Sequence, residues 1–229
     1  MFNHIKLYLF ALLLMACSLF SFKNERKCIR IVFFGDSITE AGVYPEGYIS
    51  QLRDAIAVRG QAKKYELMGA GISGNKIYDL YLRLEEDVLA LKPQVVVLYV
   101  GVNDVWHKQL FGTGTDADKF QKFYVALIQK FQKKGIQVIV CTPACIGERR
   151  AGENLMDVEL NYYSDIIRSL AKEKNLLLCD FRQAFLQYSA NNNPDNRESG
   201  ILTTDGVHLN EKGNKLIAEM LLSQLNSFK

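Results

Sequence analysis

Two short motifs near opposite ends of the chain together hold the residue types of a serine hydrolase. Ser37 follows an apolar run at residues 29–34 in the segment FFGDSIT, and Asp205 and His208 stand in DGVHLN. A carboxylate three residues before a histidine can hold its Nδ1–H while Nε2 accepts the proton of a serine hydroxyl. The spacing predicts Ser37 as nucleophile, His208 as general base and Asp205 as the acid that orients the base.

Each of these residues also has a simpler structural explanation. A serine that begins a helix often caps it by accepting a backbone N–H, and His208 could be a surface histidine of a polar loop. His107 is a second candidate base, but the only acid at matching spacing is Asp104. A loop position beside the pocket, next to Trp106, therefore suits His107 better.

Hydrolysis through a serine also needs hydrogen-bond donors for the developing oxyanion. Gly74 in GAGISGN can offer a backbone N–H with no side chain in the way, and Asn103 in GVND can offer its amide. With the backbone N–H of Ser37 they make an oxyanion hole of three donors. Taken alone, Gly74 could be an ordinary turn glycine and Asn103 could form an Asx turn that closes a strand.

Strand-like and helix-like segments alternate along the chain and must position these residues. Short apolar runs typical of buried strands occupy residues 29–34, 65–68, 95–100, 136–141 and 176–179. Apolar residues at helical spacing mark residues 48–58, 77–91, 120–131, 160–170 and 216–221. The alternation predicts an α/β protein, a three-layer α/β/α sandwich with a five-stranded parallel sheet, which binds ligands at the carboxyl ends of its strands.

The motifs resemble, in the same order, the four blocks of the SGNH (GDSL) hydrolase superfamily. They are GDSIT with Ser37, GISGN with Gly74, GVND with Asn103, and DGVH with Asp205 and His208. The resemblance implies a flavodoxin-like sheet of strand order 2-1-3-4-5 and a metal-independent esterase. Ile38 stands where the family pattern has leucine, which is a conservative departure.

Two other classes of protein deserve comparison with the esterase. Residues 69–74 match the dinucleotide-binding pattern G-x-G-x-x-G, but they do not follow the first strand, and Gln94 stands where an acidic residue is expected. A non-catalytic protein of the same fold is the other alternative. Once His4 is set aside only His107 and His208 could supply imidazole ligands to a metal. We therefore expect neither a metal nor a cofactor.

The N-terminus has the pattern of an export signal. Residues 7–22 form an almost uninterrupted apolar run between Lys6 and a polar stretch at 23–27. The run is shorter than the roughly 20 residues that a membrane-spanning helix needs. We therefore expect an exported protein, periplasmic or on the cell surface.

Residues 14–17, Leu-Met-Ala-Cys, resemble a bacterial lipobox. We expect residues 1–16 to be a lipoprotein signal peptide, Cys17 to carry lipid, residues 17–28 to be a tether and residues 29–229 to form the hydrolase domain. The alternative is an ordinary signal that is cleaved elsewhere, for example after Ser18. With lipid on Cys17, the only contact with a membrane would be this anchor.

Composition limits the remaining possibilities. The chain has 229 residues, 48% of them hydrophobic and 23% charged, which suits one folded domain and disfavours disorder. Its formal net charge of +3 comes without a long basic run, so we expect no nucleic acid partner. No feature implies a protein partner, and we predict no disulfide.

The expected substrate is a carboxylic ester with a short acyl group, above all acetyl, on a carbohydrate or small alcohol. Five strands and their helices leave only short loops, without a separate lid to shelter a long acyl chain. Export favours a poorly diffusible substrate such as an acetylated glycan, while a lysophospholipase or thioesterase is the alternative. The side chains expected to contact substrate are Asp36, Trp106, His107 and Arg149.

Overall fold

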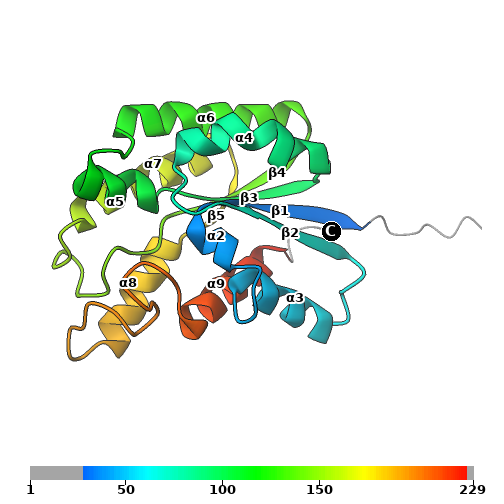
Figure 1. Ribbon diagram of the computed structural model, residues 1–229. Coiled ribbons are helices and arrows are strands. Elements are labelled where there is room, and N and C mark those ends of the chain that lie inside the picture. The colour runs from blue at the N-terminus through cyan, green and yellow to red at the C-terminus, as the bar shows by residue number, and fades with distance from the viewer. Residues whose placement is uncertain (1–27, 226–229) are drawn as a thin grey trace, which may run out of the picture.

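A five-stranded parallel sheet forms the centre of the protein in a computed structural model, which describes residues 28–225 (Figure 1). Its strands are β1 (Ile29–Gly35), β2 (Tyr65–Gly71), β3 (Val95–Tyr99), β4 (Gln137–Cys141) and β5 (Leu177–Cys179). They are hydrogen-bonded in the order β2-β1-β3-β4-β5, and every neighbouring pair is parallel. This order confirms the sheet that the motifs imply.

Helices cover both faces of the sheet, which explains why the strands consist mainly of apolar residues. Side chains alternate between the faces along a strand, and in β1 Ile31 and Phe33 join one core cluster while Val32 and Phe34 join the other. All four side chains are fully buried. The part of a strand that packs on both sides favours apolar residues, and the polar residue of β1, Arg30, lies near its start where burial is incomplete.

Helices form the two outer layers. One face carries α2 (Ser37–Ala41), α3 (Tyr48–Val58), α8 (Phe181–Asn192) and α9 (Glu211–Leu225). The other carries α4 (Ile77–Asp87), α5 (Val102–Phe111), α6 (Ala117–Lys133) and α7 (Asp157–Glu173). Figure 1 shows α4 and α6 above the sheet and α3 and α9 below it, so the expected three-layer sandwich is confirmed.

The structure adds helices that the apolar pattern did not predict. Trp106 and His107 lie on α5, which begins directly after β3, and the prediction that they lie in a loop is wrong. Residues 77–91 are also not one helix, because α4 ends at Asp87 and a short 3-10 helix, η1 (Leu89–Leu91), follows. Within residues 28–225, no helix combines the length and the apolar character needed to cross a membrane.

Two glycines let α2 pack tightly against the ends of the strands. A Cβ atom at Gly71, the last residue of β2, would lie 2.1 Å from the backbone nitrogen of Glu40. At Gly35, the last residue of β1, it would lie 2.4 Å from Oγ1 of Thr39 on α2. Side chains at these positions would push α2, and Ser37 with it, away from the sheet.

Candidate active site

Ser37 is the first residue of α2, at the carboxyl end of β1. The helix is capped by Asp36, whose Oδ1 accepts the N–H of Ile38 at 3.0 Å. Ser37 is therefore not the capping residue, and its hydroxyl instead lies 3.1 Å from Nε2 of His208. The local structure turns this oxygen toward a base 171 residues later in the chain.

Asp205 contacts His208 through both of its carboxylate oxygens. Oδ2 lies 2.7 Å from Nδ1 of the ring, and Oδ1 accepts the backbone N–H groups of Val207 at 2.9 Å and His208 at 2.7 Å. Partial burial raises the pKa of Asp205, but these hydrogen bonds outweigh it and hold the pKa below its usual value. An ionised Asp205 keeps the proton on Nδ1, which leaves Nε2 free to accept the proton of Ser37.

Gly74 and Asn103 lie at the ends of the two strands that flank β1. Gly74 has φ of 76°, a left-handed conformation that suits glycine. Asn103 is buried in the first turn of α5, and its Nδ2 donates to the carbonyl oxygen of Asn75 at 3.1 Å. It does not close the strand in an Asx turn. An amide nitrogen has two hydrogens, so this bond leaves a second donor.

Two charged residues that were not predicted as part of the site hold these turns in place. Asp104 accepts the N–H of Ile77 with both oxygens, at 3.2 and 3.3 Å, and so joins α5 to the start of α4. Arg83 donates to Oδ1 of Asn75 at 2.7 Å and to the carbonyl oxygen of Gly35 at 2.8 Å. A feature of the sequence could have pointed to Arg83: on α4 it lies three residues after Leu80 and next to Leu84, which are both buried.

A cavity of about 470 Å³ lies beside Asp205. It is lined by Trp106, Ile146, Gly147, Arg149, Glu153, Asn154, Leu155, Met156, Glu198, Asp205 and Val207. Arg149 forms an ion pair of 2.9 Å with Glu198 at its wall. The cavity is of the size that small-molecule sites have and mixes aromatic and charged groups.

The other predicted contact residues occupy different positions. His107 lies beside Gly74, since a Cβ atom there would be 3.8 Å from the His107 ring, and burial together with Lys76 lowers the pKa of His107. Asp36 is 2% exposed and caps α2, so its carboxylate serves the backbone and not a substrate, contrary to expectation. Burial raises the pKa of Asp36 to about 7.

The polar segment before Asp205 is held together by its own hydrogen bonds. Residues 191–192 belong to α8, and Asn193 is buried. Nδ2 of Asn193 donates to the carbonyl oxygens of Glu148 and Arg197, both at 2.8 Å. Asn193 therefore supports the loop from within and is not available to bond a sugar hydroxyl.

Comparison with known proteins agrees with this geometry. The model of the GDSL-like lipase/acylhydrolase family matches residues 33–216. The chain is 56% identical to a crystallised acetyl xylan esterase, AlAXEase, with a TM-score of 0.85 over 86% of this chain and 100% of that one. It is 26% identical to an acetylxylan esterase of Geobacillus stearothermophilus, over 86% of this chain and 93% of that protein.

A further relative is an uncharacterized lipoprotein, YqeF, of Bacillus subtilis, which is 24% identical over 82% of this chain and 86% of its own length. The family match spans the strands and turns that carry all four motifs, from the middle of β1 into α9. The chain therefore belongs to the GDSL-like lipase/acylhydrolase family and is a hydrolase of ester bonds.

Proposed function

We propose that the protein is a serine esterase that removes acetyl or other short acyl groups from a carbohydrate, with Ser37 as nucleophile, His208 as general base and Asp205 as its orienting acid. The observation that carries the proposal is one continuous line of hydrogen bonds. Asp205 Oδ2 lies 2.7 Å from His208 Nδ1, and His208 Nε2 lies 3.1 Å from Ser37 Oγ. Both distances suit proton transfer through the imidazole.

In the first half of the reaction Ser37 Oγ attacks the acyl carbon while Nε2 of His208 takes its proton. The carbonyl oxygen becomes an oxyanion, which receives hydrogen bonds from the backbone N–H groups of Ser37 and Gly74 and from Nδ2 of Asn103. The tetrahedral intermediate then expels the alcohol, which leaves with the proton from His208. A water molecule, deprotonated by His208, releases the acid from Ser37 in the second half.

The carbohydrate part of the proposal rests on the relatives and on the cavity beside Asp205. Two similar proteins are named as acetylxylan esterases. Trp106 at the cavity wall can pack against a sugar face. The wall holds three carboxylates, Glu153, Glu198 and Asp205, against the single guanidinium of Arg149. This charge balance favours a neutral sugar over the phosphate of a lysophospholipid.

The test compares substrates that separate these classes. We expect kcat/KM to be higher for p-nitrophenyl acetate than for p-nitrophenyl decanoate, and acetate to be released from acetylated xylan. Ser37→Ala protein, purified in parallel, measures hydrolysis that does not come from this site. Preference for decanoate, or turnover of lysophosphatidylcholine without release from acetylated xylan or pectin, would assign the protein to the lipid esterases instead.

We also propose that the protein is exported with residues 1–16 as signal peptide and is anchored through lipid on Cys17. Cys17 lies outside the residues that the structure describes. Three observations support the proposed export and lipid anchor: the apolar run at residues 7–22, the lipobox-like residues 14–17 and the similarity to a protein named as a lipoprotein. In this arrangement the tether, residues 17–28, separates the membrane surface from β1.

A further inference from the structure

Glu148, in the link between β4 and α7, is a buried carboxylate that binds the segment leading to Asp205. Its side chain accepts three consecutive backbone N–H groups. Oε2 accepts that of Ile201 at 2.8 Å, and Oε1 accepts those of Leu202 and Thr203, the latter at 3.0 Å. Glu148 is only 2% exposed. A buried carboxylate that is satisfied by the backbone of a single segment fixes the position of that segment.

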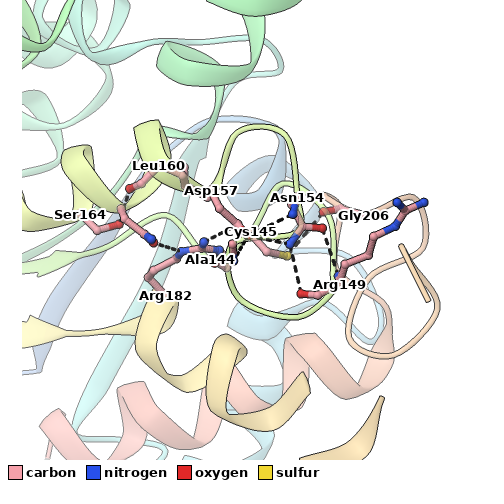
Figure 2. Close-up of polar contacts among 11 residues, drawn as sticks. Ala144, Cys145, Arg149, Asn154, Asp157, Leu160, Ser164, Arg182 and Gly206 are labelled. Atoms are coloured by element: carbon pink, nitrogen blue, oxygen red, sulfur yellow. Dashed lines mark hydrogen bonds and ion pairs between the residues drawn. The ribbon is translucent and has the colours of Figure 1, made fainter. Parts of the chain in front are cut away.

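The contacts continue from this segment to the peptide that follows Asp205. Oγ1 of Thr203 accepts the N–H of Gly206 at 3.0 Å. The carbonyl oxygen of Gly206 accepts the N–H of Gly147 at 2.8 Å and the thiol of Cys145 at 3.5 Å, a contact drawn in Figure 2. The residue next to Asp205 is thus held at its N–H by the segment that Glu148 binds, and at its carbonyl by the link that carries Glu148.

The link itself is anchored to the body of the protein. Asp157 and Arg182 form an ion pair of 2.5 Å in which both side chains are 1% exposed (Figure 2). Oδ2 of Asp157 accepts the N–H groups of Gly152 at 2.8 Å and Asn154 at 3.2 Å, while Arg182 donates to the carbonyl oxygen of Ala144 at 3.3 Å. Both ends of the link are therefore fixed, which makes it a rigid support.

We propose that Glu148 is a positioning residue for catalysis, which holds Asp205 and through it His208 at the distance from Ser37 that proton transfer requires; this role rests on the proposed function of these three residues. Glu148 acts through the backbone of residues 201–206 and touches no reacting atom. A displacement of about 1 Å in a catalytic group can cost about a hundredfold in rate. The carboxylate of Glu148 therefore affects the rate of the chemical step, and so kcat, more than it affects substrate binding.

Glu148→Gln tests this role most directly, because it keeps the size of the side chain and replaces one of its two acceptor oxygens with an NH₂ group. The new NH₂ group would face a backbone N–H of residues 201–203, and two donors cannot pair. We expect kcat for p-nitrophenyl acetate to fall by about tenfold to a hundredfold, with KM little changed. Ile128→Val, in the core on the other face of the sheet, is the control for a general loss of stability.

A double-mutant cycle separates positioning from stability. If Glu148 acts through Asp205, Glu148→Gln should cost far less in the Asp205→Asn background than in the wild type. Ile128→Val should have the same small effect in both backgrounds. The far-downfield ¹H resonance of the His208 Nδ1 proton should weaken or move in Glu148→Gln and remain in Ile128→Val.

Thr203→Val provides a second route if Glu148→Gln protein does not fold. It removes only the hydroxyl that accepts the N–H of Gly206, and we expect a smaller loss of the same kind, in kcat and not in KM. The positioning role would be overturned if Glu148→Gln lowered kcat equally in the wild-type and Asp205→Asn backgrounds and left the His208 resonance unchanged. If Glu148→Gln protein does not fold, the same result from Thr203→Val would overturn it. Wild-type kcat in Asp205→Asn alone would instead overturn the proposed function.

Discussion

The indole of Trp106 meets the imidazole of His208 edge to face, with ring centroids 6.2 Å apart and ring planes at 66°. The same indole lines the cavity beside Asp205. One side chain on α5 thus contacts both the candidate base and the space proposed for the sugar. Substitution of Trp106 should therefore distinguish an effect on the candidate base from an effect on sugar binding.

Trp106→Ala should impair glycan substrates more than small ones. Loss of an aromatic contact typically costs about 0.5–1.5 kcal/mol, so we expect kcat/KM for acetylated xylo-oligosaccharides to fall by up to about tenfold. The loss for p-nitrophenyl acetate should be smaller, because this ester does not fill the cavity. Trp106→Phe is the matched control and should keep most of the activity. Equal losses for both substrates would mean that the cavity is not part of the sugar-binding site.

Ser37→Ala should abolish ester hydrolysis and leave the fold intact. The change removes the nucleophilic oxygen and leaves little space behind, while Asp36 still caps α2. Circular dichroism and thermal unfolding should match the wild type, and p-nitrophenyl acetate hydrolysis should fall to the level without enzyme. Wild-type turnover by the purified variant would exclude Ser37 as nucleophile.

Asn103→Ala should lower kcat without removing activity. Loss of one oxyanion donor typically costs about 10² to 10³ in kcat. The carbonyl oxygen of Asn75 also loses its partner, so a modest drop in Tm should accompany the change. The informative measurement is kcat with KM determined in parallel, since an oxyanion donor acts on the transition state. A rise in KM alone would indicate a role in substrate binding.

Asp104 should make the protein less stable as the pH rises. Burial raises its pKa from 3.8 to about 7, so between these values the folded protein holds a proton that the unfolded chain has lost. The free energy of unfolding therefore falls between about pH 4 and 7, by at most about 1.4 kcal/mol per pH unit, and this loss is complete above pH 7. Asp104→Asn keeps an acceptor for the N–H of Ile77 and removes the titration.

Urea unfolding at pH 5 and pH 8 measures this effect. The difference in the free energy of unfolding between the two pH values should be smaller in Asp104→Asn than in the wild type. Asp118→Asn, a change at an exposed residue of α6, should behave as the wild type does. An unchanged difference in Asp104→Asn would mean that Asp104 is ionised throughout this range.

Cys17 should carry lipid in the cell that produces the protein. Mass spectrometry of the protein from its native membrane should find an acylated Cys17 as the first residue. Cys17→Ala should release the protein from the membrane fraction, whereas Cys28→Ala, which removes an exposed cysteine close to β1, should not. A mature protein that begins elsewhere, or that is fully soluble in the wild type, contradicts the anchor.

The fold and the candidate triad could be predicted because their signals are local. Each strand of the sheet contains a short stretch of mainly apolar residues, and the acid and base of the triad lie three residues apart. The helix α5 could not be predicted from apolar spacing, since two of its four buried residues are Asn103 and Asp104. Polar side chains on the buried face hide the periodicity that marks a helix.

The supports of the site depend on contacts between distant parts of the chain. Arg182 is buried in α8, where it forms an ion pair with Asp157, 25 residues earlier, and donates to Asn161 and Ala144. Glu148 stands beside Arg149 and Arg150 in a stretch that has the composition of an exposed surface. Its burial depends on backbone groups 53 to 55 residues later. No local pattern carries this information.

The packing of the last helix has a consequence for the timing of synthesis. The candidate base enters the site just before α9, and α9 packs on α3, where the backbone N–H of Tyr48 donates to Oδ1 of Asn214 at 2.9 Å. The candidate nucleophile, Ser37, is therefore made 171 residues before its candidate proton acceptor, His208. A growing polypeptide therefore holds the candidate nucleophile without its candidate base until this late part of the domain is made, and we expect hydrolysis to begin only after α9 has folded back onto α3.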